Sequence, residues 1–396
     1  AIGKTATATL RARTTWALDD PAQREIVEAD LNNLFLRADF PVLVDEWQRV
    51  PPIWDRVRRD VDADTTPGRF LLTGSASPKG TGTHSGSGRI ISLRMRPLSL
   101  AERFDAGDRV SLAALLSDDR VEIAGKTGML LADYVDEILR SGFPGLRGLS
   151  GRPLRIQLDS YLQRVVDRDF PELGQQIRNP SVLRRWMTAY AAASATTATF
   201  ETIRDASISG DGVVPQRSVV MPYRDVLSRL YLIDPVPGWR PTRNHIRELT
   251  EPPKHHLADP ALAAQLVGAT RESLLKGEQP GPPIPRDGTF LGALFESLVT
   301  LSIRVYAQPA EARVSHLRTQ SGRHEVDLIV ERGDGKVVAF EVKLNPTVSA
   351  NDVKHLLWLK GEIGDDMLDM VVVTTGPQAY RRADDVAVVP AALLGP

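Results

Sequence analysis

The chain has 396 residues, 42% hydrophobic and 25% charged, a composition typical of soluble globular proteins with two or three domains. Its 49 basic and 50 acidic residues nearly cancel, so nucleic-acid binding would have to come from local patches of charge. The absence of cysteine excludes disulfides, thiolate nucleophiles and cysteine-ligated zinc. We find no apolar run near the ~18 residues of a membrane span and no signal-peptide pattern, and we therefore expect a cytoplasmic protein without membrane contact.

Residues 1–125 alternate short apolar runs with a helical pattern, which predicts a parallel α/β sheet covered on both faces. A helix is expected over Pro51–Asp64, with Ile53, Trp54, Val57 and Val61 on one face. The small polar residues of Lys79–Gly88 are typical of a mobile loop. The expected strands are Thr15–Leu18, Val42–Val44, Phe70–Leu72 and Ile90–Met95.

Residues 126–285 are predicted to be mostly helical. Ser181 is expected to cap a helix whose apolar face is Val182, Leu183, Trp186, Met187 and Tyr190. The Pro- and Gly-rich stretch Gly277–Gly288 reads as a linker. Residues 286–396 return to a mixed pattern, for which we expect a long helix, a hairpin, a second helix and a strand at Met370–Thr375.

A nucleotide site is predicted near the start of the chain. Gly3, Lys4 and Thr5 form the second half of the P-loop pattern, in which the backbone cradles phosphates, the Lys reaches the β/γ oxygens and the hydroxyl ligates Mg²⁺. The tripeptide alone is weak support, but an apolar strand ending in Asp45 and Glu46 follows it. Asp45 can then hold the Mg²⁺ shell and Glu46 can polarise the attacking water.

A third element completes this trio. The run Arg69–Ser75 reads as a buried strand that ends in hydroxyls, which would bring Thr73 or Ser75 beside the γ-phosphate. The simpler interpretation of Asp45 and Glu46, an acidic strand end that caps the next helix, is favoured for that pair in isolation. The ordered trio is much harder to obtain by chance, and it favours an ATP site with Mg²⁺.

A second acidic group is predicted in a hairpin. Glu325–Glu331 and Lys336–Lys343 flank a short glycine-containing turn. If Arg332 pairs with Lys336, Asp327 lies opposite Glu341, and Lys343 shares the face of Glu341. Facing carboxylates repel each other and destabilise the hairpin. A Mg²⁺ ion between them would make the arrangement favourable. The alternative is a solvated hairpin with ordinary surface charges.

This spacing, an Asp, thirteen residues and then Glu-x-Lys, resembles the signature of the restriction-endonuclease-like fold. The resemblance implies that Asp327 and Glu341 hold Mg²⁺ and that Lys343 orients or activates the attacking water. An upstream helical Glu usually completes such a site, and Glu296 fits at the edge of its helix's apolar arc. That arc is formed by Leu291, Leu294, Phe295, Leu298 and Ser302.

Nearly the whole chain resembles prokaryotic AAA-type ATPases whose C-terminal half carries a conserved domain of unassigned function. The resemblance implies Lys4 and Thr5 at the phosphates, Asp45 at Mg²⁺, Glu46 as base, the Thr73–Ser75 turn as sensor and, more weakly, Arg89 as a γ-phosphate-sensing arginine. A surface position for Arg89 is an equally good interpretation. The matching motifs are Leu18–Pro21, Val44–Pro51, Gly68–Ala76, Gly88-Arg89, Arg96–Glu102, Gly142–Pro144, Tyr161–Asp169, Leu291–Val299, Glu325–Asp327 and Glu341–Lys343.

The start of the sequence departs from that family. The chain begins at Ala1, so the strand before the P-loop and the loop's first glycine are not in it, and a fragment starting here would have half a phosphate cradle. The short distance from Lys4 to Leu18 also leaves room for little helix after the loop.

The middle region resembles a winged-helix element in the same family. Tyr223–Leu230 reads as a helix and Tyr231–Pro237 as the strand after it, so Arg217, Arg224 and Arg229 would meet DNA phosphates. A structural adaptor between the end domains is an equally good interpretation. The neighbouring His255 and His256 would point to opposite faces of a strand, and we do not expect them to form a ligand pair.

Two functional hypotheses follow. The first is a multidomain α/β ATPase with a P-loop sheet, a helical or winged-helix-like middle and a restriction-endonuclease-like domain that acts on or senses DNA. The second is a non-enzymatic, nucleotide-binding regulatory or scaffold protein whose C-terminal domain only docks a protein partner or nucleic acid. AAA modules often work as rings, so oligomerisation is compatible with both hypotheses.

Overall fold

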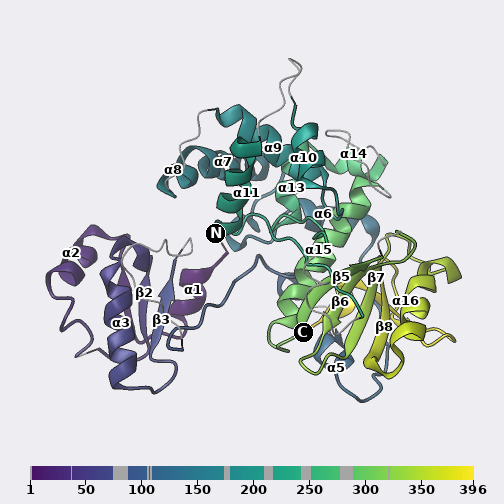
Figure 1. Ribbon diagram of the computed structural model, residues 1–396, viewed down its shortest axis with the longest axis horizontal. Coiled ribbons are helices and arrows are strands. Elements are labelled where there is room, and N and C mark those ends of the chain that lie inside the picture. The colour runs from purple at the N-terminus through teal and green to yellow at the C-terminus, as the bar shows by residue number, and fades with distance from the viewer. Residues whose placement is uncertain are drawn as a thin grey trace. The chain divides into compact units, whose positions relative to one another are not determined.

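The protein is described here by a computed structural model covering residues 2–36, 38–74, 88–104, 107, 109–173, 179–208, 217–241, 251–276, 289–319 and 322–396 (Figure 1). Ser75, most of the predicted loop Lys79–Gly88, and the whole predicted linker Gly277–Gly288 lie outside the described residues. The chain forms two compact units, Ala1–Met95 and Arg96–Pro396. The compact units thus meet at residue 95, whereas the sequence analysis ends its first segment at 125. The three-segment division stays a prediction about domains.

The first unit is a three-stranded parallel sheet with strand order β1-β2-β3 (Figure 1). Three of the four strands predicted for this segment are confirmed. The helix expected over Pro51–Asp64, after the strand that ends in Asp45, is confirmed as well. The elements are α1 (Lys4–Thr9), β1 (Thr14–Ala17), α2 (Pro21–Ala29), β2 (Val42–Asp45), η1 (Trp47–Arg49), α3 (Pro52–Ala63) and β3 (Phe70–Thr73).

The core of this unit explains why those strands form. All four residues of β2 are buried, because the strand is paired on both edges and covered by apolar side chains from the helices. On α3, Ile53 and Val57 are buried and Trp54 and Val61 are half-buried, as the helical pattern predicts. The predicted fourth strand, Ile90–Met95, is wrong. Its backbone joins no sheet, and Ile91 and Leu93 are exposed instead of buried.

The second unit begins with short elements and a group of helices. Helix α9 is capped by Asn179, whose side chain accepts a hydrogen bond from the Ser181 N–H at 3.1 Å, so the prediction of Ser181 as the cap is wrong. The elements are α4 (Leu100–Arg103), β4 (Val110–Ser111), α5 (Leu112–Leu115), α6 (Leu131–Leu139), η2 (Pro144–Leu146), α7 (Gly151–Arg164), the π-helical turn η3 (Val165–Asp169), α8 (Phe170–Glu172), α9 (Pro180–Ala192), α10 (Phe200–Ala206), α11 (Arg217–Arg229), α13 (Pro260–Val267) and α14 (Arg271–Lys276).

The strand predicted after α11 is also wrong. Over Tyr231–Pro237 the described residues form only isolated bridges, Ile233 with Leu257 and Val236 with Lys254. Pro235 and Pro237 have no N–H to donate, which prevents a regular ladder in this stretch. The segment therefore runs beside residues 254–257 as an irregular strand pair. That pairing fixes the backbone of Lys254.

A six-stranded mixed sheet closes the second unit, with strand order β5-β6-β7-β8-β10-β9. The predicted long helix, hairpin, second helix and strand are all present, whereas β5, β9 and β10 were not predicted. The elements are α15 (Phe290–Ala307), β5 (Arg313–Arg318), β6 (Glu325–Glu331), β7 (Val337–Val342), α16 (Ala350–Ile363), η4 (Gly364–Asp366), β8 (Met367–Thr374), β9 (Tyr380–Arg381), β10 (Ala387–Pro390), η5 (Ala391–Leu393) and β11 (Leu394–Gly395), which pairs with β4.

Helices α15 and α16 lie on either side of this sheet (Figure 1). Val353, Leu356 and Leu359 of α16 share a core with Ile329 and Ala339 of the hairpin. Helix α15 is buried almost all round, whereas the sequence analysis expected a single apolar stripe. Its 18 residues are long and apolar enough to cross a membrane, which corrects our finding of no such run, but 72% of the helix is buried inside the protein, as in a core helix.

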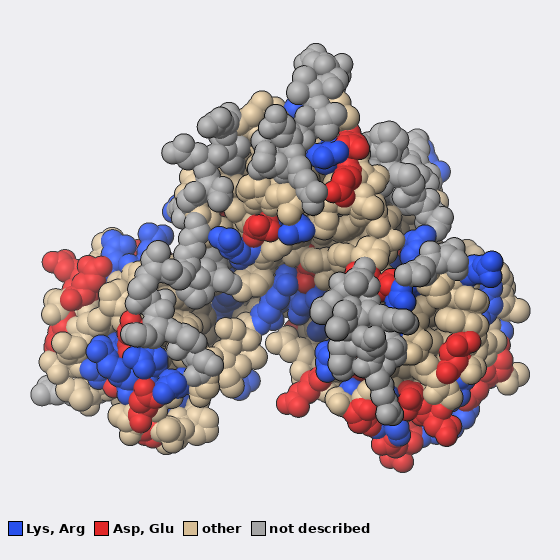
Figure 2. Space-filling view, in the orientation of Figure 1, with Lys and Arg blue, Asp and Glu red and all other residues tan. Residues whose placement is uncertain are grey.

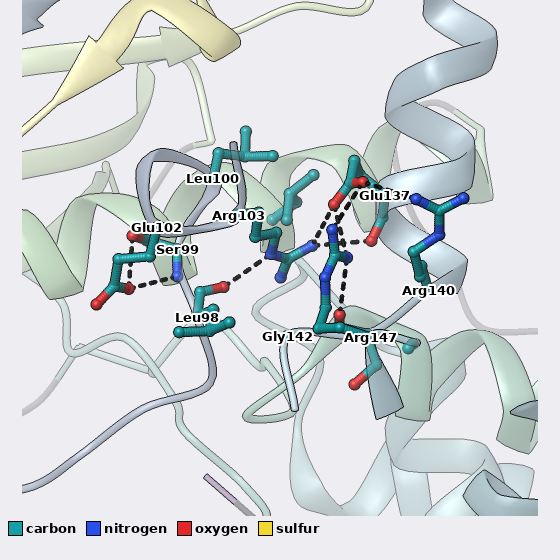
Figure 3. A network of polar contacts seen from close by, with 12 residues as sticks. Leu98, Ser99, Leu100, Glu102, Arg103, Glu137, Arg140, Gly142 and Arg147 are labelled. Atoms are coloured by element: carbon teal, nitrogen blue, oxygen red, sulfur yellow. Dashed lines mark hydrogen bonds and ion pairs between the residues drawn. The ribbon is translucent and has the colours of Figure 1, made fainter. Parts of the chain in front are cut away.

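Two of the motifs from the sequence join in a buried polar network (Figure 3). Leu98 N–H donates to the carbonyl of Gly142 at 2.8 Å, and the Arg103 guanidinium donates to the Leu98 carbonyl and the Glu137 carbonyl. Arg147 also holds both oxygens of the Glu137 carboxylate. Any side chain at Gly142 would collide with Arg103 and with the Leu98 carbonyl. These motifs therefore hold the start of the second unit against α6.

Candidate functional site

Asp45 is the centre of a hydroxyl cluster at the carboxyl end of the first sheet. The strand register sets Ala17, Asp45 and Thr73 side by side at the ends of three parallel strands. Asp45 is 6% exposed, and its carboxylate accepts hydrogen bonds from the Thr73 hydroxyl and, at 3.0 Å to each oxygen, from the Thr5 hydroxyl. The carboxyl edge of a parallel sheet is the place where open α/β folds bind ligands.

Thr5 reaches Asp45 because α1 begins at Lys4. Gly3 stands before the helix with φ of 85°, in the left-handed region that glycine adopts without strain, and its carbonyl accepts from Thr7 N–H at 2.9 Å. Helix α1 has six residues, in line with the short helix expected after the loop. The structure thus brings together Gly3, Lys4 and Thr5 on one element beside the end of β2.

Glu46 follows directly after β2 in a strained conformation. Its φ of 55° and ψ of 41° lie in the left-handed region, which costs a residue with a Cβ roughly 1–3 kcal/mol. The Glu46 carboxylate accepts a hydrogen bond from the side-chain amide of Gln48. Gly74 permits this arrangement, since a Cβ there would lie 2.6 Å from Gln48 Oε1. Gln48 was quoted in a motif but not predicted as a site residue.

The other residues predicted to sense the nucleotide are Arg89 and Ser75. Arg89 forms an ion pair with Asp62 of α3, and its side chain is 41% exposed. Ser75 lies outside the described residues, so only Thr73 of the predicted sensor turn is seen with Asp45. The sensor roles of Arg89 and Ser75 stay predictions.

The oxygen donors around Asp45 fit Mg²⁺. One carboxylate and two threonine hydroxyls converge there, and Mg²⁺ is bound in proteins by oxygen ligands, usually one or two carboxylates completed by water and phosphate. The described residues give Asp45 no cationic partner. Its negative charge is therefore balanced only by hydroxyl dipoles.

The second group of predicted residues meets at the hairpin of β6 and β7. Leu328 pairs with Phe340, and Arg332 N–H donates to the Lys336 carbonyl, so the predicted register is confirmed. Counting back places Asp327 opposite Glu341. One oxygen of Asp327 accepts from Val342 N–H at 2.9 Å, and Glu341 accepts from Lys343 Nζ at 2.8 Å. Both acids are buried, which excludes the alternative of a solvated hairpin.

A pocket of about 560 Å³ contains every residue that was predicted for this second site. Glu296 from α15, Asp327 from β6, and Glu341 and Lys343 from β7 line it. Ser194–Ala198, from the helical part of the same unit, line its other side. The remaining charged or titratable lining residues are Arg318, Glu325 and His355.

Lys254 sits among the acids of this pocket, and the sequence analysis missed it. Its ammonium lies 2.9 Å from Glu296 Oε1, 3.1 Å from Asp327 Oδ1 and 3.2 Å from Glu325 Oε1. The side chain is 1% exposed, so the charge has no water to solvate it. Lys254 follows two prolines in a stretch without periodicity, and its partners lie 42 and 73 residues further on. No pattern in the sequence connects them.

The pKa shifts of Lys254 and Asp327 both favour the charged form of the side chain. Burial lowers the pKa of Lys254, but attraction to Glu296, Asp327 and Glu325 raises it well above its usual value. Burial also acts to raise the pKa of Asp327, yet Lys254, Lys343 and the Val342 N–H hold it at about 2. For Glu296, burial is the largest effect and raises the pKa to about 8.

Glu341 differs from the other acids because half of its carboxylate has no partner. Its Oε1 is buried and makes no hydrogen bond within the described part of the chain, while Oε2 is held by Lys343. Burial, and then repulsion by Asp327, raise the pKa of Glu341 well above its usual value. Glu341 lines the pocket, and its orphan oxygen is a buried acceptor whose hydrogen-bonding capacity the described residues leave unused.

The middle region provides no comparable group among the described residues. The Arg224 guanidinium lies 5.0 Å from the centre of the Phe200 ring and 3.4 Å from Asp225, and Arg229 is exposed at the end of α11. The side chain of Arg217 lies outside the described residues. His255 donates to the Ala198 carbonyl and His256 bonds to Ser297, so the two neighbours have different partners. DNA binding by this region stays a prediction.

Comparisons with known proteins match three successive segments. Residues 2–104 match the model of an AAA domain, residues 131–273 a domain of unknown function (DUF8612), and residues 291–394 another domain of unknown function (DUF4143). Two relatives, from Mycobacterium bovis and Mycobacterium tuberculosis, are each 24% identical over 358 residues, covering 88% of this chain and 68% of theirs, and both are named as uncharacterized. No solved structure is significantly similar to the chain.

The first segment is therefore similar to AAA domains, a class of ATP-binding P-loop modules. The match covers the whole Asp45 cluster together with Glu46. The C-terminal match agrees with the sequence-based expectation of a conserved domain of unassigned function. It assigns no activity to the pocket around Lys254.

Proposed function

We propose that the AAA domain binds ATP with Mg²⁺ and hydrolyses it. The observation that carries this proposal is the hydrogen-bonded group of Thr5, Asp45 and Thr73 at the carboxyl ends of parallel strands. Glu46 follows at once in the strained backbone conformation that is common at functional sites. These features agree with the order of motifs in P-loop proteins.

The proposed roles follow from the chemistry of each side chain. Lys4 supplies positive charge for phosphate oxygens, while Thr5 and Asp45 supply oxygen ligands to the cation. Glu46 orients the attacking water, and Gln48 positions the Glu46 carboxylate by the hydrogen bond described above. Thr73 holds Asp45 from the neighbouring strand and faces the same edge. When bound, Mg²⁺ neutralises charge on the phosphate oxygens during phosphoryl transfer.

Steady-state ATP hydrolysis by the full chain tests the proposal. Glu46→Gln should lower the rate at least ~100-fold while nucleotide still binds, whereas Lys4→Ala should weaken nucleotide binding itself. Glu28→Gln on α2 and Lys354→Ala on α16 are matched controls, because both side chains are exposed and distant in sequence from the cluster. Hydrolysis that survives in both site variants would remove the AAA domain from the reaction.

We propose for the C-terminal pocket that it docks a DNA phosphodiester without cutting it. Two cations at the pocket, Lys343 and Arg318, support binding of an anionic strand. Lys254 favours docking over cleavage, because its ammonium lies among the acids that a Mg²⁺-dependent nuclease would need for metal. We therefore propose ATP hydrolysis for the AAA domain, as in the first functional hypothesis, and docking without catalysis for the C-terminal domain, as in the second.

DNA binding and DNA cleavage separate these alternatives. Fluorescence anisotropy with a labelled oligonucleotide should show binding that weakens in Arg318→Ala and loses about one unit of its logarithmic salt dependence. Supercoiled plasmid should remain intact with Mg²⁺ or Mn²⁺ present. Nicking that disappears in Asp327→Ala and Lys343→Ala would establish the nuclease instead. Absence of both binding and nicking would leave a protein partner as the ligand.

A further inference from the structure

Three carboxylates converge on one point in the C-terminal pocket. Glu296, Glu325 and Asp327 come from a helix and a strand, and each places an oxygen 2.9–3.2 Å from Lys254 Nζ. Several buried carboxylates at one point repel each other strongly and persist only beside a cation. The ammonium donates hydrogen bonds to Glu296 and Asp327 and forms an ion pair with Glu325.

The position of that ammonium is incompatible with a divalent cation. Mg²⁺ requires oxygens at about 2.0–2.1 Å in octahedral geometry, so it cannot share the space among these carboxylates with an ammonium. The second oxygen of Asp327 is already occupied by Val342 N–H. No group of three or more His, Asp or Glu side chains in the described part of the chain is arranged to hold a metal ion. The residues present therefore do not fit the metal that the nuclease-like signature implies.

The backbone of Lys254 is also held in place by hydrogen bonds. Its N–H and carbonyl both bond to Val236 at 2.9 Å, and the chain continues into His255 and His256, each of which has its own partner. Withdrawing the ammonium would therefore require the whole strand pair with Val236 to move. The cation is built into the fold.

We propose that Lys254 is the permanent cation of this acid cluster and takes the place of a divalent metal, so that the pocket receives its ligand without one. The ligand then meets the partly exposed cations of the pocket, Lys343 and Arg318, whose side chains are 34% and 37% exposed although each pairs with an acid, Glu341 and Glu325. This inference deepens the docking function proposed above. The test of the inference uses no DNA. A failure of the inference about Lys254 is therefore distinguishable from a failure of the DNA-docking proposal.

The test is a titration with Mn²⁺ in the full chain without nucleotide, on an Asp45→Asn background that removes the N-terminal cation ligand. This protein should bind no Mn²⁺ that depends on Asp327. Adding Lys254→Ala should create one Mn²⁺ site per chain, at least ~10-fold tighter than any binding in the parent, because three acids lose their cation. Asp327→Asn should abolish the new site, and Lys354→Ala, which removes an exposed lysine, should create none.

Thermal unfolding provides a second readout. The Lys254→Ala protein should unfold at a lower temperature than its parent, and Mn²⁺ should restore part of that loss, since a ligand that binds only the folded state stabilises it. A folded Lys254→Ala protein that gains no Mn²⁺ site would overturn the inference. If Lys254→Ala and Lys254→Met both fail to fold, the Mn²⁺ titration of the parent Asp45→Asn protein decides the question. Stoichiometric Mn²⁺ binding lost on Asp327→Asn overturns the inference, and its absence supports it.

Discussion

The two candidate sites treat buried negative charge in opposite ways. In the first unit, Asp45 is buried, and the side-chain donors that reach its carboxylate from the described residues are the hydroxyls of Thr5 and Thr73. In the second unit, Glu296 and Asp327 surround the buried ammonium of Lys254. The first site leaves a negative charge for a cationic ligand to balance, while the second balances its own.

This difference shows why a list of acidic residues does not define a metal site. Both sites have carboxylates at the ends or edges of strands in an α/β unit, and both patterns in the sequence predict Mg²⁺. What separates them is whether the protein supplies a cation of its own. Surface charge gives no guidance, because Lys and Arg are interspersed with Asp and Glu over the visible face of the molecule (Figure 2).

Loss of Lys254 should produce the largest effect on stability. Lys254→Met keeps the length of the side chain but leaves the buried acids without their cation, which should lower the free energy of unfolding of the second unit by about 3–5 kcal/mol. Urea denaturation measures this change. Lys254→Met combined with Asp327→Asn should cost less than the sum of the two single changes. Additive effects would mean that the two groups do not interact.

Loss of Asp45 should affect activity more than stability. Asp45→Asn keeps an acceptor for both threonine hydroxyls but removes the charge that balances a cation, so ATP hydrolysis should fall at least ~100-fold, or about 2.7 kcal/mol in the barrier. Steady-state hydrolysis measures the loss. Asp60→Asn on α3 is the control, since that carboxylate pairs with Arg56 outside the cluster. An equal loss in both variants would point to general damage to the unit.

Buried histidines should make the second unit sensitive to acid. Burial lowers the pKa of His255 and of His316 from 6.5 to about 4. The unfolded chain therefore takes up protons near pH 6.5 that the folded chain refuses, and stability present above pH 6.5 is lost as pH falls toward 4. Each histidine should contribute a slope that approaches about 1.4 kcal/mol per pH unit, while the raised pKa values of Glu296 and Glu341 contribute slopes of the opposite sign.

Denaturation at pH 7 and at pH 5 measures that slope. The double variant His255→Gln and His316→Gln should lose the contribution of these two histidines and become less sensitive to acid than the parent, because glutamine keeps a hydrogen-bond donor for the Ala198 and Pro252 carbonyls but does not titrate. An unchanged slope in the double variant would assign the acid sensitivity to other groups.

The smallest effect is expected for Thr73→Val. The change removes one of two hydroxyl donors to the ionised Asp45, which should cost about 1.5 kcal/mol in the unfolding of the first unit without ligand. Mg²⁺ and nucleotide together should recover part of that loss by binding the folded state. Thermal shifts with and without MgATP measure both quantities. If MgATP does not change the loss of stability in Thr73→Val, Thr73 is not part of the nucleotide site.

The sequence predicted the elements whose pattern is local. Val42–Val44, Phe70–Leu72 and the hairpin register from Arg332 and Lys336 were confirmed, because continuous apolar runs and a short turn determine them. β5 was missed, since the two apolar residues of Arg313–Arg318, Val314 and Leu317, are three positions apart and break the alternation typical of a strand. Ile90–Met95 has a strand-like composition but no neighbouring strand to pair with among the described residues.

The candidate sites show the same limit. Thr5, Asp45 and Thr73 were predicted as one group because each ends or begins an element of known order, and their proximity follows from the parallel register. Lys254 belongs to an irregular segment, and only the folded chain brings it to Glu296 and Asp327. A partner supplied by tertiary contact alone leaves no periodic signal in a single sequence.

The bridge between Val236 and Lys254 has a consequence for modularity. Lys254 falls within the match at residues 131–273, whereas the acids it neutralises fall within the match at 291–394. A fragment cut between these matches would keep three interior carboxylates and forfeit their counterion. We therefore expect residues 286–396 expressed alone to be poorly folded at neutral pH, as amide hydrogen exchange would reveal, so that evolution can exchange these two segments only as a pair.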